Sequence, residues 1–192
     1  MNNSNENKTT VSVINDSPDS VFRLTDISML IGETNFNSIN QKLNYYVRNK
    51  KILSPRRGIY TKLAYSHQEL ANKIYTPSYV SLETVLSQSG IIQQADYAIT
   101  SVSYLSRQIN VADKIFSYHK FKGEVLVNPL GIKRIDSVNI AIPERAFLDL
   151  LYLGKQYDFN INTLNKRIIN KLLPIYHSKK LSELVKKLFK ND

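Results

Sequence analysis

Seven cationic side chains and no carboxylate occur between Thr34 and Gln68. Lysine and arginine at this density are suited to bind phosphate, because their N–H groups donate charge-assisted hydrogen bonds to anionic oxygens. No Asp or Glu within the segment competes for them. The segment is therefore predicted to contact a polyanion such as nucleic acid. Its cations are Lys42, Arg48, Lys50, Lys51, Arg56, Arg57 and Lys62.

The positive charge of the chain lies in two blocks. Counted along the sequence, the formal charge is −3 over residues 1–33, +7 over 34–68, zero over 69–154 and +6 over 155–192, which gives the net +10. This distribution favours a localised phosphate-binding surface over a protein that is cationic all over.

The pattern around the first basic block is a helix, a turn, a second helix and a hairpin. A short helix is predicted over Thr25–Ile31, a turn at Gly32 and a longer helix over Phe36–Asn49. A basic hairpin follows over Lys50–Tyr60. This order is that of a winged helix-turn-helix, which places its second helix in the DNA major groove. We therefore predict such a domain over residues 19–62.

The second predicted helix has an apolar side and a polar side. The apolar side, at spacings of three and four, comprises Phe36, Ile39, Leu43, Tyr46 and Val47. The other side carries amides, hydroxyls and cations, which hydrogen-bond base edges and phosphates. An ordinary surface helix has the same polarity, but the absent carboxylates and the basic hairpin favour DNA. The predicted contacts on this helix are Asn37, Ser38, Gln41, Lys42, Asn44, Tyr45 and Arg48.

Turn chemistry predicts the hairpin. In the segment 55–58, with sequence PRRG, proline fixes φ and glycine accepts a positive φ. The flanking strands are expected at Ile52–Leu53 and Ile59–Tyr60. Adjacent arginines at a hairpin tip suit a phosphate backbone or a minor groove, and a solvated basic turn is the alternative. The DNA contacts predicted around this hairpin are Lys50, Lys51, Arg56, Arg57 and Tyr60.

A leader and a second domain are expected on either side of this domain. Residues 1–18 are rich in Asn, Ser, Thr and Asp and are predicted to be a flexible leader, with a short helix or strand at Val11–Ile14 left open. Residues 63–192 are predicted to form a mixed α/β domain with a small twisted sheet and C-terminal helices. The whole chain is thus predicted to be α+β.

Caps, prolines and β-branched runs predict the elements of the second domain. The predicted helices are His67–Ile74, Ser78–Ser89, Glu144–Leu153, Asn162–Leu173 and Ser178–Lys190. The predicted strands are Tyr97–Tyr104, Lys114–Phe121, Glu124–Asn128 and Val138–Ile142. Three interpretations of the last helix stay open: a partner-binding helix, a second contact with DNA, or a packed helix with solvated lysines.

Several stretches resemble the AbiEi antitoxins, the regulator-like halves of the AbiE abortive-infection and toxin–antitoxin systems. The resemblance covers Val21–Leu153 and rests on Glu69–Glu83 (ELANKIYTPSYVSLE), Ile99–Val102 (ITSV) and Ile142–Tyr152 (IPERAFLDLLY). It is most specific in Tyr75–Glu83 (YTPSYVSLE) and Pro143–Asp149 (PERAFLD). It implies a DNA-binding N-terminal domain that represses its own operon, with the promoter DNA as partner. It also implies a C-terminal domain that counters a nucleotidyltransferase toxin encoded nearby. An alternative is a protein-interaction module that contacts the toxin, with DNA binding secondary.

The same two stretches also have a purely structural interpretation. In the first, Val80 and Leu82 would supply core packing. In the second, Glu144, Arg145 and Asp149 would form an i, i+4 pattern on a helix surface.

Residues suited to catalysis or to metal binding are not clustered in the sequence. The chain has no cysteine, which excludes disulfides, thiol nucleophiles and cysteine metal sites. Its three histidines are isolated from metal-ligand partners. A nuclease would need clustered carboxylates to hold Mg²⁺, but Asp113, Glu124 and Asp136 occur in separate segments. We therefore expect no catalytic site, cofactor or metal.

A cytoplasmic protein without a membrane partner is expected. The N-terminal stretch is polar and lacks the apolar region of a secretory signal. No apolar run approaches the ~20 residues that a membrane span needs.

Overall fold

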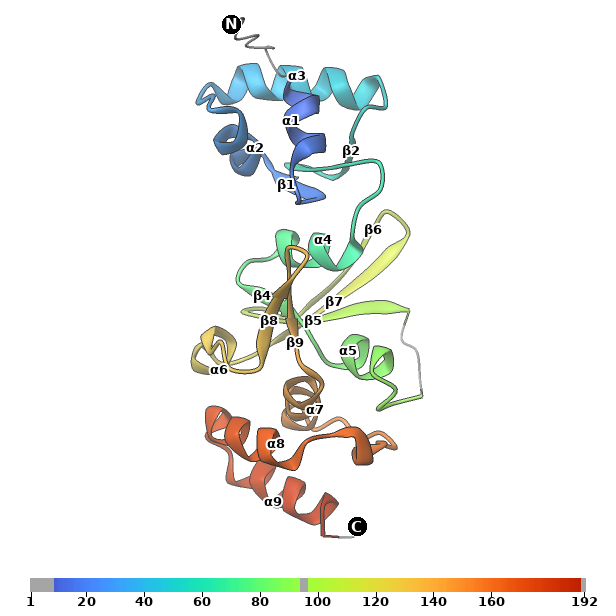
Figure 1. The fold of residues 1–192 in the computed structure, drawn as a ribbon, viewed down its shortest axis with the longest axis vertical. Coiled ribbons are helices and arrows are strands. Elements are labelled where there is room, and N and C mark those ends of the chain that lie inside the picture. Colours follow the sequence, from blue (N-terminus) through green and yellow to red (C-terminus); the bar gives the residue numbers. More distant parts are fainter. Residues whose placement is uncertain (1–8, 94–96, 191–192) are drawn as a thin grey trace, which may run out of the picture. The chain divides into compact units, whose positions relative to one another are not determined.

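The chain is an α+β protein made of two compact units (Figure 1). The computed structural model describes residues 9–93 and 97–190, which contain nine α-helices, a three-stranded antiparallel sheet and a six-stranded mixed sheet. The first unit ends at Ile74 and the second begins at Tyr75. This division differs from the boundary expected after Lys62, because helix α4 (His67–Ile74) belongs to the first unit.

The first unit combines four helices with the three-stranded sheet. Strand β3 is central and pairs antiparallel with β1 and β2 on either side. Before α4, its elements in chain order are α1 (Thr10–Asp16), β1 (Val21–Arg23), α2 (Leu24–Ile31), α3 (Phe36–Arg48), β2 (Leu53–Arg56) and β3 (Ile59–Thr61). They enclose a core of Ile14, Phe22, Ile27, Ile39, Leu43, Ile52 and Tyr60.

Helix α1 occupies part of the segment expected to be a flexible leader. The Thr9 hydroxyl caps it by accepting a hydrogen bond from the backbone N–H of Ser12. Ile14 is only 1% exposed and lies in the core of the unit. Burying such a side chain is worth about 1.5–3 kcal/mol, which explains why this stretch joins the fold. Residues 1–8 of the expected leader lie outside the described residues.

Helices α2 and α3 confirm the two helices predicted from the sequence, each to within one residue at either end. Gly32 ends α2 in the left-handed conformation, with φ +67°. The side-chain oxygen of Asn35 accepts hydrogen bonds from the backbone N–H groups of Asn37 and Ser38 and so begins α3. This cap fixes where the long helix starts and therefore which side chains share a side.

A single carboxylate joins α4 to the start of β1. Glu69 is 2% exposed, and its oxygens accept hydrogen bonds from the backbone N–H groups of Ser20 and Val21, at 3.0 Å for each closest pair, and from the Ser20 hydroxyl. The helix is thereby tied to the sheet that supports α2 and α3.

Replacing Glu69 with alanine is expected to destabilise the chain by about 1–3 kcal/mol, because the N–H of Val21 and that of Ser20 lose their acceptor. Urea denaturation followed by circular dichroism measures the change. Glu124→Ala removes an exposed carboxylate and should stay within about 0.5 kcal/mol of the parent chain. Equal midpoints for the two variants would contradict the role given to Glu69.

The second unit is built on the six-stranded sheet, with strand order β6-β7-β5-β4-β9-β8. The pairs β5–β7 and β4–β9 are parallel, and the other three pairs are antiparallel. The strands are β4 (Ser78–Val80), β5 (Ala98–Ser103), β6 (Arg107–Val111), β7 (Lys114–Lys120), β8 (Ile132–Ile135) and β9 (Val138–Ala141).

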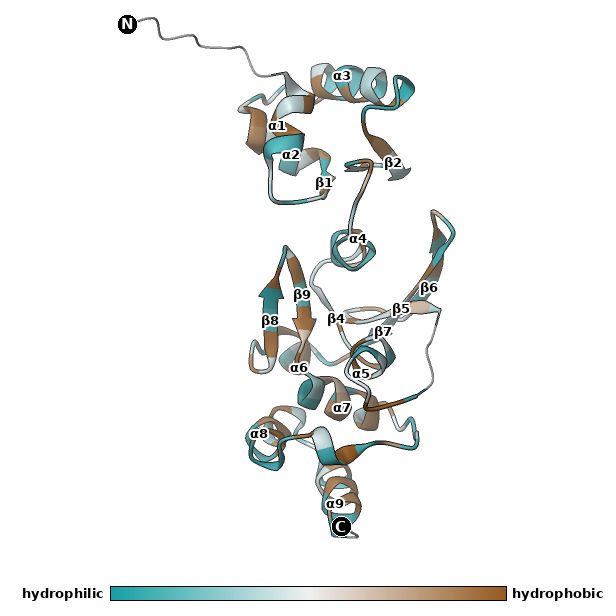
Figure 2. Cartoon of the chain, turned by 45° about the vertical axis from the view of Figure 1, so that its right-hand side comes forward, coloured by the Kyte–Doolittle hydropathy of each residue, from teal (hydrophilic) through white to brown (hydrophobic). Residues whose placement is uncertain are grey.

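Five helices complete this unit. Figures 1 and 2 show α7 between the sheet and the two tail helices α8 and α9. The helices are α5 (Glu83–Gln88), α6 (Gly123–Val127), α7 (Pro143–Tyr152), α8 (Lys166–Leu172) and α9 (Lys179–Leu188). Pro143 occupies the first turn of α7, as predicted.

The structure confirms most of the elements predicted over residues 63–192. Helix α4 matches its predicted range, and β5, β7, β9 and α7 match theirs to within one residue. Helix α9 matches the last predicted helix to within two residues. The helix predicted over Asn162–Leu173 is interrupted: a 3-10 turn, η1 (Ile161–Thr163), precedes α8, which Asn165 caps.

Two predicted elements are wrong. The helix predicted over Ser78–Ser89 is strand β4 followed by α5, because Ser78–Val80 pairs with β5 and Leu82 adopts φ +59° between them. The strand predicted over Glu124–Asn128 is helix α6, in which the adjacent Val125 and Leu126 are both buried. A short apolar run has the same sequence pattern in a buried helix and in a buried strand.

Strands β6 and β8 were not predicted because each forms an edge of the sheet and is largely exposed. Lys133 and Arg134 make the middle of β8 hydrophilic (Figure 2). Charged side chains on an edge strand discourage pairing with another chain.

Arg145 and Asp149 form an i, i+4 ion pair as the structural interpretation suggested, but the pair is buried and not on the helix surface. Both side chains are 0% exposed, and the Arg145 Nε lies 3.2 Å from Asp149 Oδ1. The hydroxyls of Ser81 and Tyr176 donate to the Asp149 carboxylate at 2.7 and 2.6 Å. The Arg145 guanidinium donates to the Tyr79 hydroxyl at 3.1 Å. Because α7 is covered on several sides, its polar residues are partnered inside the unit.

The protonation of this pair follows from its surroundings. Burial alone would lower the pKa of Arg145, but the Asp149 carboxylate next to it raises that pKa above its ordinary value. Burial raises the pKa of Asp149, while Arg145 and the hydroxyls of Tyr176 and Ser81 act in the opposite direction.

The Arg145 guanidinium also donates hydrogen bonds to the backbone carbonyls of Leu130 and Val125, at 2.9 and 2.7 Å. The network therefore depends on every member being present.

Candidate nucleic-acid interface

The outer side of α3 carries most of the predicted DNA contacts. Figure 1 shows α2 and the small sheet on one side of α3. Figure 2 shows that α3 is largely hydrophilic. The side chains exposed on it are Asn37, Gln41, Lys42, Asn44, Tyr45 and Arg48, and Ser38 is half-buried. We call these seven residues the α3 surface.

The apolar residues of α3 explain this orientation. Ile39 and Leu43 are 0% exposed, and Tyr46 and Val47 pack against the same core. Phe36, which was predicted on the apolar side, is the first residue of the helix and is 45% exposed instead. The amides and cations of the α3 surface therefore face solvent because the opposite side is anchored.

One carboxylate reaches this surface from outside the carboxylate-free segment. Glu33 Oε2 lies 2.7 Å from Lys42 Nζ. The hydrogen bond from Lys42 lowers the pKa of Glu33, so this glutamate stays ionised at neutral pH. The sequence did not indicate the pair, because Glu33 lies nine residues before Lys42, across the turn between α2 and α3. A phosphate bound at Lys42 has to compete with Glu33.

The hairpin after α3 is confirmed, but its turn is shorter than predicted: Pro55 and Arg56 belong to strand β2, and the turn is Arg57–Gly58. Arg56 and Arg57 are exposed at the β2–β3 connection, where Gly58 adopts φ +77°. Lys50 and Lys51, between α3 and β2, are also exposed. The four cations are accessible to a phosphate backbone.

Tyr60 does not belong to this exposed set, so its predicted contact with DNA needs correction. It is 6% exposed, packs in the core of the unit and donates a hydrogen bond to the Asn40 side chain at 3.3 Å. Strand β3, which contains it, lies between β1 and β2, so all three of its residues are buried.

Two more cations lie near the hairpin turn and were missed from the sequence. Arg23 and Lys73 line a shallow pocket of about 330 Å³ together with Arg56 and Arg57. Arg23 donates to the backbone carbonyl of Lys73, whose ammonium pairs with Asp26 at 2.7 Å. These cations come from elements far apart in sequence, so only the pairing of β1 with β3 and the packing of α4 against β1 bring them together.

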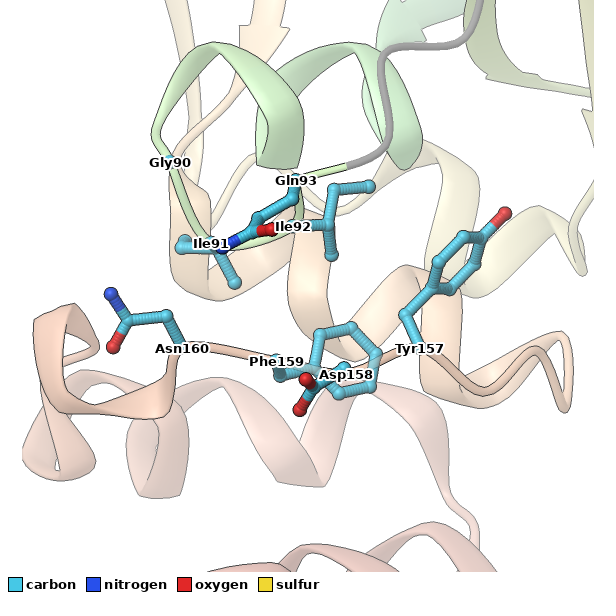
Figure 3. Close-up of a pocket in the computed structure, with 8 residues that line it drawn as sticks. All are labelled: Gly90, Ile91, Ile92, Gln93, Tyr157, Asp158, Phe159 and Asn160. Carbon is cyan, nitrogen blue, oxygen red and sulfur yellow. The ribbon is translucent and has the colours of Figure 1, made fainter.

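A second pocket, in the other unit, lacks comparable chemistry (Figure 3). It has a volume of about 330 Å³ and lies between the segment after α5 and the segment after α7. Asp158 is its carboxylate, and Gln93 and Asn160 supply amides. Within residues 9–93 and 97–190, no group of three or more His, Asp or Glu side chains is placed to hold a metal ion. In the same ranges, no helix is long and apolar enough to cross a membrane.

Comparison of the sequence with protein-family models and with curated proteins found no match. The function is therefore inferred from the chemistry of the first unit, in which an anchored helix exposes amides and cations beside a basic turn.

Proposed function

We propose that the chain is a cytoplasmic repressor that binds double-stranded DNA through a winged helix-turn-helix in its first unit. Helix α3 would enter the major groove, and the β2–β3 turn would be the wing. The observation that carries this proposal is the α3 surface, where six polar or cationic side chains are exposed opposite the buried Ile39 and Leu43.

The order of the elements supports the proposal. Helix α1, strand β1, helices α2 and α3 and the β2–β3 hairpin follow one another, with sheet order β1-β3-β2. In a helix-turn-helix the second helix of the pair contacts base edges while the first crosses the backbone. Here that pair is α2 and α3, joined at Gly32.

The side chains of the α3 surface fall into two chemical groups. Asparagine and glutamine can donate and accept together, which matches the adenine edge in the major groove. Asn37, Gln41 and Asn44 are the candidates for this role. The cations of α3 and of the hairpin suit phosphates, whose contacts fix the register on DNA without reading its sequence. These are Lys42, Arg48, Lys50, Lys51, Arg56 and Arg57.

The resemblance to AbiEi antitoxins extends the proposal to repression of the chain's own operon and to countering a nucleotidyltransferase toxin encoded nearby. The two stretches that carry it meet inside the second unit, where Tyr79 contacts Arg145 and Ser81 contacts Asp149. These contacts support a structural role for the shared residues. Growth of cells that express the neighbouring nucleotidyltransferase gene, with and without this chain, tests the antitoxin part. If the chain did not restore growth, the antitoxin role would be excluded, and the proposal of DNA binding would be unaffected.

A double variant of the wing tests whether the first unit binds DNA as proposed. Because each neutralised phosphate contributes about −0.9 to the slope of log affinity against log salt, Arg56→Ala with Arg57→Ala is expected to flatten that slope by about 1.8. Fluorescence anisotropy with duplex DNA from upstream of the gene, over a range of salt concentrations, gives the slope.

A matched double variant separates wing contacts from net charge. Lys133→Ala with Arg134→Ala removes the same charge from the exposed edge strand β8 and should leave the slope unchanged. A slope near zero for the parent chain, or equal flattening in both double variants, would exclude the proposed interface.

A further inference from the structure

Helices α8 and α9 of the second unit enclose a groove that has an apolar floor and a cationic rim. Its volume is about 230 Å³. The floor is made of the buried Ile169 and Val185 and the half-buried Leu173 and Phe189. The rim is made of the exposed Lys166, Asn170, Lys186 and Lys190. The groove therefore offers apolar contact and positive charge side by side.

The positive charge of the rim is not compensated locally. Among residues 9–93 and 97–190, none of the three rim lysines has a carboxylate within ion-pair distance. Glu183, the acidic residue of α9, lines a different pocket together with Lys180 and Lys187. Within the described ranges, an occupant of the groove with carboxylates would thus meet lysines that no carboxylate already pairs with.

The size of the groove favours side chains of a protein over a bound cofactor. Cavities that hold small molecules commonly measure about 300–1,000 Å³, and this groove is smaller. An amphipathic helix, by contrast, inserts only the side chains of its apolar side into a groove between helices. A helix with Leu or Phe on one side and Glu or Asp at its margins matches both the floor and the rim.

A nucleic acid fits the same groove less well. Single strands bind by stacking bases on exposed aromatic rings. Phe189 is the aromatic residue of this groove, but Lys166 Nζ already lies 5.0 Å from its ring centroid. Its ring also makes an edge contact with Phe147, at 6.3 Å between centroids. The rest of the floor is aliphatic, which offers a peptide more contact than it offers a base.

We propose that this groove binds an acidic amphipathic helix of a partner protein. Apolar side chains of the partner pack against Ile169 and Val185, and its carboxylates pair with Lys166, Lys186 and Lys190. This interaction belongs to the second unit and does not depend on DNA binding by the first.

The test uses the full chain and a fluorescein-labelled peptide of about 15 residues, long enough for a helix to form. Its Leu and Phe residues recur at spacings of three and four, and Glu fills the other positions. Exchanging Lys166, Lys186 and Lys190 for glutamate is expected to weaken binding at least about tenfold. The matched control exchanges Lys171, Lys179 and Lys180 for glutamate; these lysines are also exposed but do not line the groove, so binding should change by no more than about twofold.

A second peptide tests the apolar floor independently of charge. It has the same composition, reordered so that its apolar residues are spread around the helix, and it is expected to bind at least about tenfold more weakly. Circular dichroism checks that both triple variants keep the parent fold.

Three results would overturn the proposal. These are absence of peptide binding by the parent chain, equal binding of the two peptides, and equal loss in the two triple variants. An oligonucleotide that binds the parent chain and the control variant but not the groove variant would instead assign the groove to nucleic acid.

Discussion

Replacing Arg145 with methionine is expected to destabilise the second unit by about 3–5 kcal/mol, because it leaves a buried carboxylate without its cation. Asp149 is 0% exposed, and the tyrosine and serine hydroxyls that remain cannot neutralise its charge. Urea denaturation followed by far-UV circular dichroism measures the loss. Arg134→Met, at an exposed position of β8, is the control and should change stability by less than about 0.5 kcal/mol.

The pH dependence of this variant has a definite sign. Burial raises the pKa of Asp149 in the folded chain, and Arg145 opposes that rise. Without Arg145, the folded state favours the protonated carboxyl more strongly than the unfolded state does. The folded state is then favoured at low pH, and this advantage is lost as pH rises through the raised pKa. The stability gap between Arg145→Met and the parent chain should thus be smaller in acid than at neutral pH.

A double replacement distinguishes a charge effect from a packing effect. Arg145→Met with Asp149→Leu removes both charges and should be more stable than Arg145→Met alone, as found when buried ion pairs are exchanged for apolar residues. If the double variant lost as much as the sum of both single variants, the two side chains would act independently and the network interpretation would fail.

Replacing Gln41 and Asn44 with alanine is expected to reduce the preference for the chain's own upstream DNA over an unrelated duplex at least about thirtyfold. Each well-placed amide contributes about 1–3 kcal/mol of discrimination between bases, and about 1.4 kcal/mol corresponds to a factor of ten. Both side chains are exposed on α3, so their removal leaves the core intact. Competition anisotropy with the two duplexes at one salt concentration gives the ratio.

The salt dependence separates base contacts from phosphate contacts. The amides carry no charge, so this variant should keep the parent salt slope, in contrast to the variant of Arg56 and Arg57. Gln108→Ala with Asn110→Ala, on exposed positions of β6, is the matched control and should leave the preference unchanged. An unchanged preference after loss of Gln41 and Asn44 would mean that α3 does not read bases.

The elements of the first unit could be predicted because local signals agree there. Asn35 and Gly32 are strong cap residues, and the apolar spacing between Ile39 and Leu43 places the core side of α3. Helix α1 was less predictable, since its sequence is short and the burial of Ile14 depends on residues from other elements.

The sequence predicted which side chains of α3 are exposed. It did not predict which residues contact one another at the candidate site. Exposure of Gln41, Asn44 and Arg48 follows from helical periodicity. The burial of Tyr60 follows from its place in a central strand, and the pairing of Glu33 with Lys42 follows from how α2 and α3 are joined. Neither is a property of the local sequence.

Tertiary pairing also explains the errors in the second unit. Ser78–Val80 is a strand only because β5 and β9 flank it, and no local pattern marks it as one. Likewise, Arg145 and Asp149 have the spacing of a surface ion pair, but the tail helices and the sheet cover α7 on opposite sides.

The pairing of Glu33 with Lys42 has a consequence for how a DNA-binding chain of this kind would search a genome. In the free protein the Glu33 carboxylate pairs with Lys42 at 2.7 Å, so a phosphate of unrelated DNA would have to displace it. If the chain binds DNA as proposed, its residence on such stretches would be short and its transfer to the next stretch fast. Under the same proposal, only a DNA sequence that also hydrogen-bonds the amides of α3 would compensate for the loss of the Glu33–Lys42 pair and retain the protein. A single acidic residue would thus shorten the time lost on wrong sites.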